Sequence, residues 1–184
     1  TVPSTSGAPS LEARERQYRA LTGSVGATKD ELARAVAVRA TAFLRHNAPA
    51  ADALRHGEKD DLRDDVVLLV ARSKLDGGVL GTIRIQPNLR TPMHLESVIS
   101  LSFPFNESRC VEFIRLGVLN GSSGRLVSFA LAKASYEICR ATQMDYIFVC
   151  SRAPVDTMYR RSIFDAFLAG RNLALQLPPA VPPS

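Results

Sequence analysis

Residues 110–119 form an apolar run that carries two charged side chains, Glu112 and Arg115. The run is rich in β-branched and aromatic residues and is closed by turn residues, which is typical of a β-strand. Because a lone buried charge costs several kcal/mol, we expect each of these charges to have a partner or a chemical task. A β-bulge between them would turn both side chains to one face and leave backbone N–H groups unpaired.

A helix is predicted directly after this strand, over residues 125–141. It follows the turn formed by Asn120, Gly121, Ser122, Ser123 and Gly124, and the free N–H groups at such a helix start favour an anion. Apolar residues at helical spacing predict a buried stripe of Val127, Leu131, Ala134 and Ile138. Three basic residues gather on the opposite side: Arg125, Lys133 and Arg140. This side is either a solvated face or a surface for an acidic partner.

The composition predicts one soluble domain. At 184 residues, with 46% hydrophobic and 22% charged residues, the chain has the size and balance of an ordinary globular protein. The net charge of +5 favours acidic partners, but no basic block or nucleic-acid motif accompanies it, so nucleic-acid binding is not expected. Neither a signal peptide nor an apolar run of membrane-spanning length is present, which predicts a cytoplasmic protein without stable membrane insertion.

The three cysteines, Cys110, Cys139 and Cys150, all lie inside apolar runs. Their odd number and apolar surroundings favour reduced core thiols over disulfides. No metal-ligand spacing is present, so we expect no metal site.

The remaining sequence predicts elements in the order of a single α/β or α+β domain. A capping box at Thr28 and Glu31 predicts a helix over residues 28–46, and a second helix is predicted over 154–167. Strands are predicted over 18–25, 66–71, 79–86, 144–150 and 172–177. The connection 88–109 is expected to include a short helix near 95–99. Residues 1–10 and 178–184 are predicted to be a disordered leader and tail around the domain at 11–177.

The predicted helix 28–46 carries an arginine among its apolar residues. Its inward stripe is predicted from four residues: Leu32, Val36, Ala40 and Phe43. Arg39 falls within this stripe and needs a carboxylate if it is buried, because a guanidinium cannot give up its proton. The acidic stretch 47–65 contains carboxylates, although most of them fit a solvated loop. Arg84 likewise interrupts the strand predicted over 79–86.

These residues resemble the motifs of a known superfamily. The order of elements is similar to that of the GNAT acyltransferases, and residues 159–164, Tyr-Arg-Arg-Ser-Ile-Phe, resemble their Tyr-x-x-x-Gly-Phe signature. More specifically, the chain resembles the acyl-homoserine-lactone (autoinducer) synthases in four motifs that occur in the same order. The matching residues are Arg39 and Phe43; Asp61 and Asp64; Gly81, Arg84 and Pro87; and Glu112 and Arg115.

Two departures make the chain more similar to the long-chain N-acyl amino acid synthases, which are relatives of the autoinducer synthases. Pro49 lies near the place of an autoinducer-synthase tryptophan, and little sequence follows the Tyr159 segment. The resemblance implies a GNAT-like fold, with a mixed sheet of about six or seven strands, a bulge or splay at the central strand, and flanking helices. It also implies no tightly bound cofactor, since the donor is an acyl-phosphopantetheine thioester on acyl carrier protein.

Amide formation from a thioester requires a neutral amine, a stabilised oxyanion and, at the end, a protonated thiolate. Glu112 is the candidate base, unless it forms a structural ion pair with an arginine: Arg39, Arg84 or Arg115. A bulged backbone N–H near Gly117 is the candidate oxyanion donor, since glycine permits a close approach. The resemblance implies that Tyr159 protonates the thiolate, and core packing is the alternative role of this tyrosine.

The resemblance further implies an ionic network of Arg39, Asp61, Asp64 and Arg84, with Arg115 more structural than catalytic. One of the arginines could instead bind the acceptor's carboxylate bidentately. Phe43 is expected in the core or along the acyl pocket. The carrier protein is expected to contact seven residues: Gly121, Ser122, Ser123, Gly124, Arg125, Lys133 and Arg140.

The sequence thus favours an N-acyltransferase that moves a long-chain fatty acyl group from acyl carrier protein to the amino group of an amino acid such as tyrosine. Two alternatives stay open: an autoinducer synthase that uses S-adenosylmethionine, and a domain that binds acyl carrier protein or lipid without turnover. The charges retained inside predicted strands speak against the last, since apolar residues could replace them at little cost in stability.

Overall fold

The computed structural model describes residues 21–25, 28–45, 48–121, 124–150, 165–167 and 172–176. For the segments 21–25, 165–167 and 172–176 it describes the backbone alone. Several predictions fall outside the described residues: the leader 1–10, the tail 178–184, and the roles of Ser122, Ser123 and Tyr159.

The described strands form one mixed sheet in the order β1-β2-β3-β4-β5-β7-β6. They are β1 Leu21–Val25, β2 Val67–Ser73, β3 Val79–Pro87, β4 Cys110–Val118, β5 Tyr146–Cys150, β6 Asp165–Phe167 and β7 Asn172–Gln176. Neighbouring strands are antiparallel except β4 and β5, which run parallel. The predicted mixed α+β class is confirmed, and each predicted strand overlaps an observed one.

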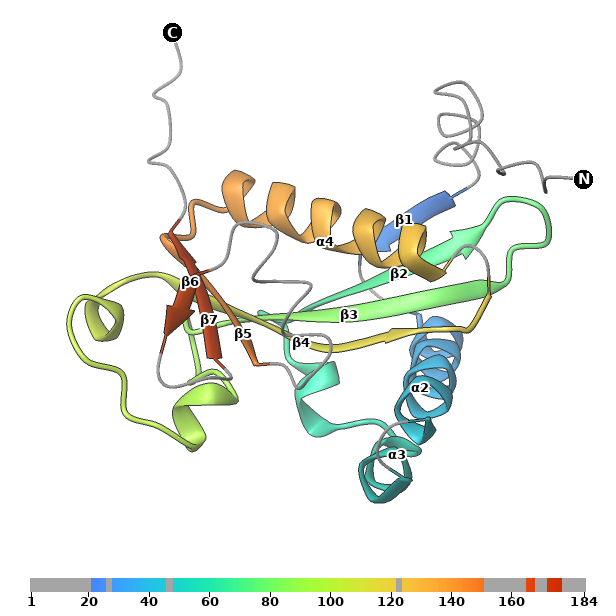
Figure 1. Ribbon diagram of the computed structural model, residues 1–184, viewed down its shortest axis with the longest axis horizontal. Coiled ribbons are helices and arrows are strands. Elements are labelled where there is room, and N and C mark those ends of the chain that lie inside the picture. The colour runs from blue at the N-terminus through green and yellow to red at the C-terminus, as the bar shows by residue number, and fades with distance from the viewer. Residues whose placement is uncertain are drawn as a thin grey trace, which may run out of the picture.

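Helices cover both faces of this sheet (Figure 1). Helix α4, Gly124–Ala141, lies on one face, and helix α2, Lys29–Leu44, lies on the other with α3, Ala48–Leu54, packed beside it. Two glycines permit these close approaches. A Cβ at Gly81 would lie 2.7 Å from Val127 Cγ1 of α4, and a Cβ at Gly117 would lie 2.9 Å from Arg39 Cα of α2.

The two faces of the sheet differ in chemistry. The α4 face carries the largest apolar cluster, which includes Ile83 and Ile85 of β3. Because side chains alternate along a strand, the neighbouring residues of β3 point toward α2. The buried polar side chains of the central strands lie on this α2 face: Thr82, Arg84, Gln86 and Glu112. The sheet therefore separates an apolar core from a polar, charged interior.

The predicted helix 28–46 is observed as α2, and its capping box is present. The Glu31 N–H donates to Thr28 Oγ1 (3.2 Å), and the Thr28 N–H donates to Glu31 Oε2 (3.0 Å). The predicted inward stripe is only partly right, because Leu32, Ala40 and Phe43 are half-buried. The fully buried residues are Ala35, Val36, Val38, Arg39 and Ala42. The helix backbone approaches the sheet closely at Gly117, so mainly small residues face the strands and larger ones lie at the margin.

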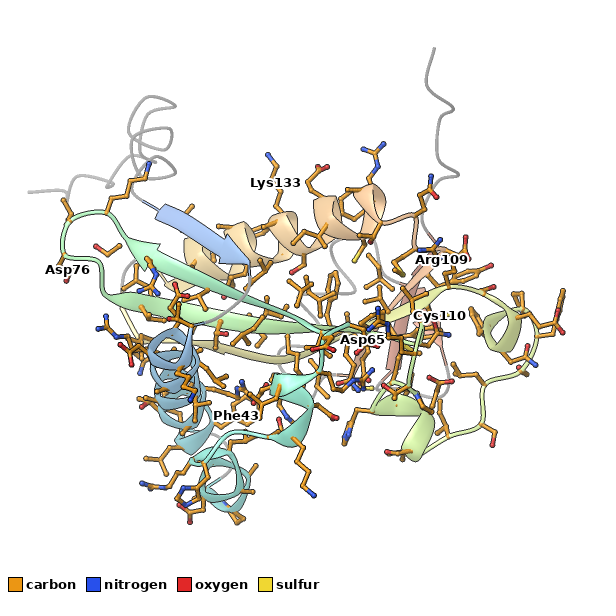
Figure 2. The ribbon with its side chains drawn as sticks, turned by 180° about the vertical axis from the view of Figure 1, so that it is seen from behind. Phe43, Asp65, Asp76, Arg109, Cys110 and Lys133 are labelled. Carbon is orange, nitrogen blue, oxygen red and sulfur yellow. The ribbon has the colours of Figure 1, made fainter. Side chains whose placement is uncertain are left out.

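Helix α4 also differs from its predicted stripe. Its buried residues are Val127, Leu131, Ser135 and Cys139, whereas Ala134 is exposed and Ile138 is half-buried. The helix packs along one row of residues four apart instead of alternating steps of three and four. Arg125, Lys133 and Arg140 are exposed, and Figure 2 shows Lys133 pointing away from the sheet.

The connections between these elements hold short helices. The stretch 47–65, expected to be mostly a solvated loop, contains α3 and the 3-10 helix η1, Lys59–Leu62. The connection 88–109 contains η2, Leu95–Ser97, where a short helix was predicted, and η3, Phe105–Glu107. Residues 154–164 of the helix predicted over 154–167 lie outside the described residues. The end of this prediction is wrong, because Asp165–Phe167 pairs with β7 as strand β6. Among the described helices, none combines the length and apolar content needed to cross a bilayer.

We expect Gly117→Ala to lower the free energy of unfolding by about 1–3 kcal/mol, because the added methyl group would press on the α2 backbone at Arg39. Urea denaturation followed by circular dichroism measures this change. Gly78→Ala is the control, since an added Cβ there meets only the exposed side chain of Asp76. Equal losses in both variants would contradict a tight contact between α2 and β4.

Candidate active site

Three arginines from three different elements meet on the α2 face of the sheet. Arg39 comes from α2, Arg84 from β3 and Arg115 from β4. The side chains of Arg39 and Arg84 are 0% exposed and that of Arg115 is 21% exposed. Buried guanidinium groups of this kind require carboxylate partners, because an uncompensated internal charge is strongly destabilising.

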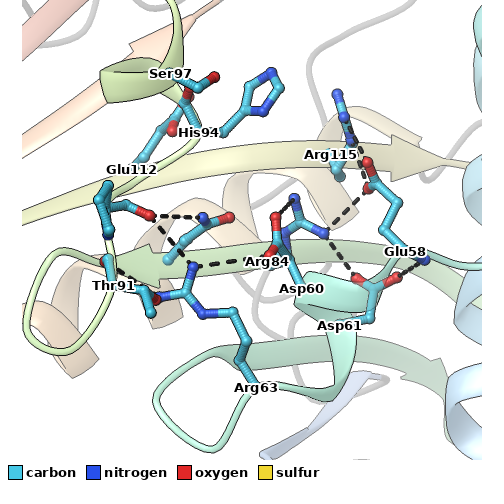
Figure 3. A network of polar contacts seen from close by, with 12 residues as sticks. Glu58, Asp60, Asp61, Arg63, Arg84, Thr91, His94, Ser97, Glu112 and Arg115 are labelled. Carbon is cyan, nitrogen blue, oxygen red and sulfur yellow. Dashed lines mark hydrogen bonds and ion pairs between the residues drawn. The ribbon is translucent and has the colours of Figure 1, made fainter. Parts of the chain in front are cut away.

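The 3-10 helix η1 and the residue before it supply these carboxylates (Figure 3). Asp61 accepts two hydrogen bonds from Arg39, at 2.9 and 3.1 Å, and one from Arg84, at 3.1 Å. Glu58 accepts one bond from each of these arginines, at 3.2 and 3.1 Å, and two from Arg115, at 2.8 and 2.7 Å. Residues three apart lie on the same side of a 3-10 helix, which brings both carboxylates to the arginines.

The predicted network also included Asp64, and this assignment is wrong. Asp64 is exposed and forms no ion pair with any residue in the described part of the chain. Glu58 forms the ion pairs that were expected of Asp64. The two carboxylates that bind the arginines are therefore those of Glu58-x-x-Asp61 and not those of Asp61-x-x-Asp64. Both pairs have the same acidic spacing, and only the position of η1 against the three arginines distinguishes them.

The arginines keep the carboxyl groups of Glu58 and Asp61 in the ionised form. Burial by itself would raise the pKa of Glu58, but the hydrogen bonds and charges of Arg115, with Arg84 and Arg39, outweigh it and lower that pKa. Burial opposes ionisation of Asp61 in the same way, and Arg39 is the main group that lowers its pKa. The more exposed Asp60 adds a further negative charge 3.7 Å from Arg84.

Glu112 lies on the same face but outside this cluster. It is 0% exposed, its Oε2 accepts a hydrogen bond from the Leu95 N–H (2.8 Å), and its Oε1 meets no nitrogen or oxygen donor in the described part of the chain. Burial raises the pKa of this carboxyl group. The structural ion pair that was the alternative to a catalytic role is not formed with Arg39, Arg84 or Arg115.

Cys150, at the end of β5, lies beside the Glu112 carboxyl group. Desolvation and the charge of Glu112 raise the pKa of this thiol to about 12. Cys110 and Cys139 are buried as expected, but Cys150 is exposed and so differs from its predicted core position. Among the described residues, no group of three or more histidine, cysteine or acidic side chains is arranged to hold a metal ion.

A β-bulge is present in β4, but it lies at Arg115 and Leu116 instead of between Glu112 and Arg115. Thr82 of β3 pairs with Gly117, and Arg84 pairs with Ile114, so one residue of β3 faces two residues of β4. Arg115 is at the bulge and has φ of 61°, a left-handed conformation that costs a non-glycine residue about 1–2 kcal/mol. This strained backbone directs the Arg115 side chain toward Glu58. The bulge therefore connects β4 to the ionic cluster.

Gly117 follows this bulge, and its lack of a side chain makes room for α2. That packing requirement accounts for glycine at this position independently of chemistry. The role of its backbone N–H as an oxyanion donor stays a prediction. Phe43 is half-buried on α2 (Figure 2), and its place along an acyl pocket also stays a prediction.

An apolar cavity of about 290 Å³ lies on the opposite face of the sheet, near the end of α4. Its walls include Val67, Ile85, Val111, Ile138 and Met144, with Asp65 and Arg109 among its polar lining residues. Ile85 and Val111 neighbour Gln86 and Glu112 in sequence and therefore point to the other side. The cavity is thus separated from Glu112 by the sheet.

No protein-family model matches the chain, and no curated protein matches it significantly. Solved structures do match. FeeM, an N-acyl amino acid synthase from uncultured soil microbes, has a TM-score of 0.68 at 12% identity, over 85% of this chain and 89% of FeeM. TofI, solved in a ternary complex with an inhibitor and MTA, has a TM-score of 0.59 at 16% identity, over 84% and 90% of the two chains.

A third match is a GNAT family acetyltransferase from Brucella melitensis in complex with acetyl-CoA. Its TM-score is 0.54 at 19% identity, over 88% of this chain and 92% of that one. Identities this low establish the fold and not the activity. The chain therefore has the GNAT acyltransferase fold, as the resemblance of its motifs implied. FeeM is among the solved structures that share this fold over most of their length.

Proposed function

We propose that this protein is an N-acyltransferase that moves a long-chain fatty acyl group from an acyl carrier protein thioester to the amino group of an amino acid such as tyrosine. The observation that carries the proposal is Glu112: a buried carboxyl group with a raised pKa, outside the ion pairs that neutralise its neighbours. A structural carboxylate would be expected within that network, whereas a base needs a raised pKa and no guanidinium partner. Among the described residues, the Glu112 carboxyl group accepts hydrogen bonds only from the Leu95 N–H and from the Cys150 thiol, which is a weak donor.

The reaction requires the acceptor's ammonium group to lose a proton before its nitrogen attacks the thioester carbonyl. Glu112 accepts this proton, directly or through one water, most readily through Oε1, since Oε2 is bonded to Leu95. The tetrahedral oxyanion is held by a backbone N–H at the bulge between Arg115 and Gly117. Collapse of this intermediate breaks the C–S bond and releases the carrier thiolate, which Tyr159 protonates. The nitrogen gives up its second proton as the amide forms, and this proton is returned to Tyr159 through solvent.

Arg115 is the group best suited to bind the acceptor's carboxylate. It is the most exposed of the three clustered arginines. Its hydrogen bonds within the described part of the chain go to Glu58 through Nε and Nη2, which leaves Nη1 for another acceptor there. Arg39 and Arg84 are completely buried and more suited to hold Glu58 and Asp61 in place. The N-acyl amino acid synthase FeeM, which shares the fold, supports an amino acid as the acceptor class.

The donor surface is proposed on α4 and the turn before it. Arg125, Lys133 and Arg140 are exposed on this helix. Positive side chains of this kind attract an acidic carrier protein and speed its association. Gly121 and Gly124 flank the helix start, where backbone N–H groups favour the single phosphate of a phosphopantetheine arm.

Mass spectrometry of organic extracts from a bacterial host that overexpresses the chain tests this function. We expect N-acyl amino acids in extracts of the wild-type host and their loss with Glu112→Gln. Acyl lactones would instead identify an autoinducer synthase that uses S-adenosylmethionine. An extract identical to that of the empty host would favour a binding domain without catalysis and would refute the proposal.

A further inference from the structure

Arg63 joins two segments that the three-arginine cluster does not reach. Its Nε and Nη2 donate to the two carboxylate oxygens of Asp65, at 3.0 and 2.9 Å. The same guanidinium donates to three backbone carbonyls, that of Pro87 at the end of β3 (3.5 Å) and those of Thr91 (3.3 Å) and Pro92 (3.4 Å) after it. The acidic segment 58–65 is thereby tied to the start of the connection 88–109 (Figure 3).

The connection 88–109 also donates a hydrogen bond to Glu112, the proposed base. Three residues after Pro92, the N–H of Leu95 donates to Glu112 Oε2 at 2.8 Å. Gln86 Nε2 lies 3.5 Å from the Pro92 carbonyl, so its support of the same point is weaker. Asp60 lies between the three-arginine cluster and the contacts of Arg63: its carboxylate is 3.8 Å from the Arg63 guanidinium and 3.7 Å from that of Arg84. The contacts run without a break from the ionic cluster to Arg63, to residues 91–95, and to Glu112.

We propose that Arg63 is a positioning residue: it holds residues 91–95 so that the Leu95 N–H stays on the Glu112 carboxylate. The inference rests on the proposed function only where it assigns Glu112 the role of base. A hydrogen bond to the charged form of an acid favours that form. Loss of the Arg63 contacts therefore raises the pKa of Glu112 further and delays its ionisation to higher pH.

Arg63 does not contact the Glu112 carboxyl group, so its effect passes through the backbone of residues 91–95. The charged or titratable groups around Glu112 are His94 beside η2, Arg84 of β3, Arg115 of β4 and Cys150 of β5. Arg84, Arg115 and Cys150 lie outside residues 91–95, whereas His94 lies within this segment. The charge of His94 also lowers the pKa of Glu112, so displacement of His94 would raise this pKa in the same direction as loss of the Leu95 bond. Lysine retains the positive charge toward Asp65, but a single ammonium lacks the planar fork that reaches a carboxylate and three carbonyls together.

Arg63→Lys in the full chain is the test, and Arg55→Lys is the matched control. Arg55 pairs with Asp52 at 2.8 Å on the surface, where its side chain is 57% exposed. Nuclear magnetic resonance of the Glu112 carboxyl carbon, assigned with Glu112→Gln, measures its titration, and amide exchange measures the Leu95 bond. We expect Leu95 to exchange about tenfold faster and Glu112 to titrate at higher pH in Arg63→Lys, with neither change in Arg55→Lys.

Unchanged Leu95 exchange or unchanged Glu112 titration in Arg63→Lys overturns the proposal. Asp65→Asn is the second variant, which keeps Arg63 but removes the charge of its carboxylate partner. Leu95 exchange should again become faster and Glu112 should again titrate at higher pH, with both changes smaller than in Arg63→Lys. In Arg63→Lys, the acid limb of the pH–rate profile should shift to higher pH together with the titration of Glu112. The rate should recover at high pH, where Glu112 is ionised. Altered titration in a protein whose wild type forms no amide would refute the proposed function and leave the Arg63 coupling established.

Discussion

Asp61→Asn is expected to lower the free energy of unfolding by about 3–5 kcal/mol. The Asp61 side chain is 0% exposed and accepts three hydrogen bonds from two arginines that are themselves 0% exposed. An asparagine keeps the shape but not the charge, and only one of its two terminal atoms can accept from the arginines. Among the described residues, Arg39 would then keep Glu58 as its only carboxylate partner. Because a domain of this size is stabilised by about 5–15 kcal/mol in total, the loss is large.

Urea denaturation measures this change, and Asp52→Asn is the matched control. Asp52 also pairs with an arginine, Arg55, but both side chains are more than half exposed. Exposed pairs contribute about 0–1 kcal/mol, so this control should change stability little. Similar losses in the two variants would show that the buried cluster does not hold the acidic segment.

The pH dependence of stability gives an independent check of Asp61. Its folded-state pKa is lowered, so it contributes stability above its unfolded pKa, and this contribution is lost as the pH falls through the folded-state value. Asp61→Asn removes this titration. The stability of the variant should therefore fall less steeply than that of the wild type below about pH 4.

Glu112→Gln is expected to change activity and stability in opposite directions. Loss of a general base should slow amide formation by about 10²–10⁴-fold. The free energy of unfolding at neutral pH should increase, because a neutral amide of the same shape avoids the penalty of burying a charge and still accepts from the Leu95 N–H. Steady-state rates with an acyl carrier protein donor and urea denaturation measure the two effects.

The sign of the pH effect follows from the raised pKa of Glu112. The folded state holds this proton more tightly than the unfolded state, so the contribution of Glu112 to stability is complete below its unfolded pKa. It is lost as the pH rises through the raised folded-state pKa. The stability gained by Glu112→Gln should therefore grow across this window and vanish below it. A variant that is less stable at every pH would show that Glu112 is a structural carboxylate.

Local sequence signals predicted most of the elements of this fold. The capping box at Thr28 fixed the start of α2, and the apolar run with two charges predicted β4 and its bulge. These signals depend on a few neighbouring residues and on the backbone groups that those residues satisfy. The position of Arg39 in the apolar stripe of one helix was also enough to predict that it pairs with a carboxylate, because a buried guanidinium cannot lose its proton.

The carboxylates that pair with Arg39 could not be identified from neighbouring residues alone. Glu58 and Asp64 are both three residues from Asp61, and the acidic stretch 47–65 read mostly as a solvated loop. Once η1 is placed against β3 and β4, Glu58 meets all three arginines and Asp64 faces solvent. Arg63 carried no motif that would have revealed its three carbonyl partners, because these lie 24 to 29 residues further along the chain.

The sequence by itself determined the class of fold, the bulged strand and the presence of buried arginines that need partners, because these depend on spacing along one element. Only the tertiary structure decided which faces of α2 and α4 are buried, that Glu58 replaces Asp64, and that Glu112 stays outside the ion pairs. Each of these depends on how closely two elements approach, and that distance is set by residues far apart in the sequence, such as Gly117 against the backbone of Arg39.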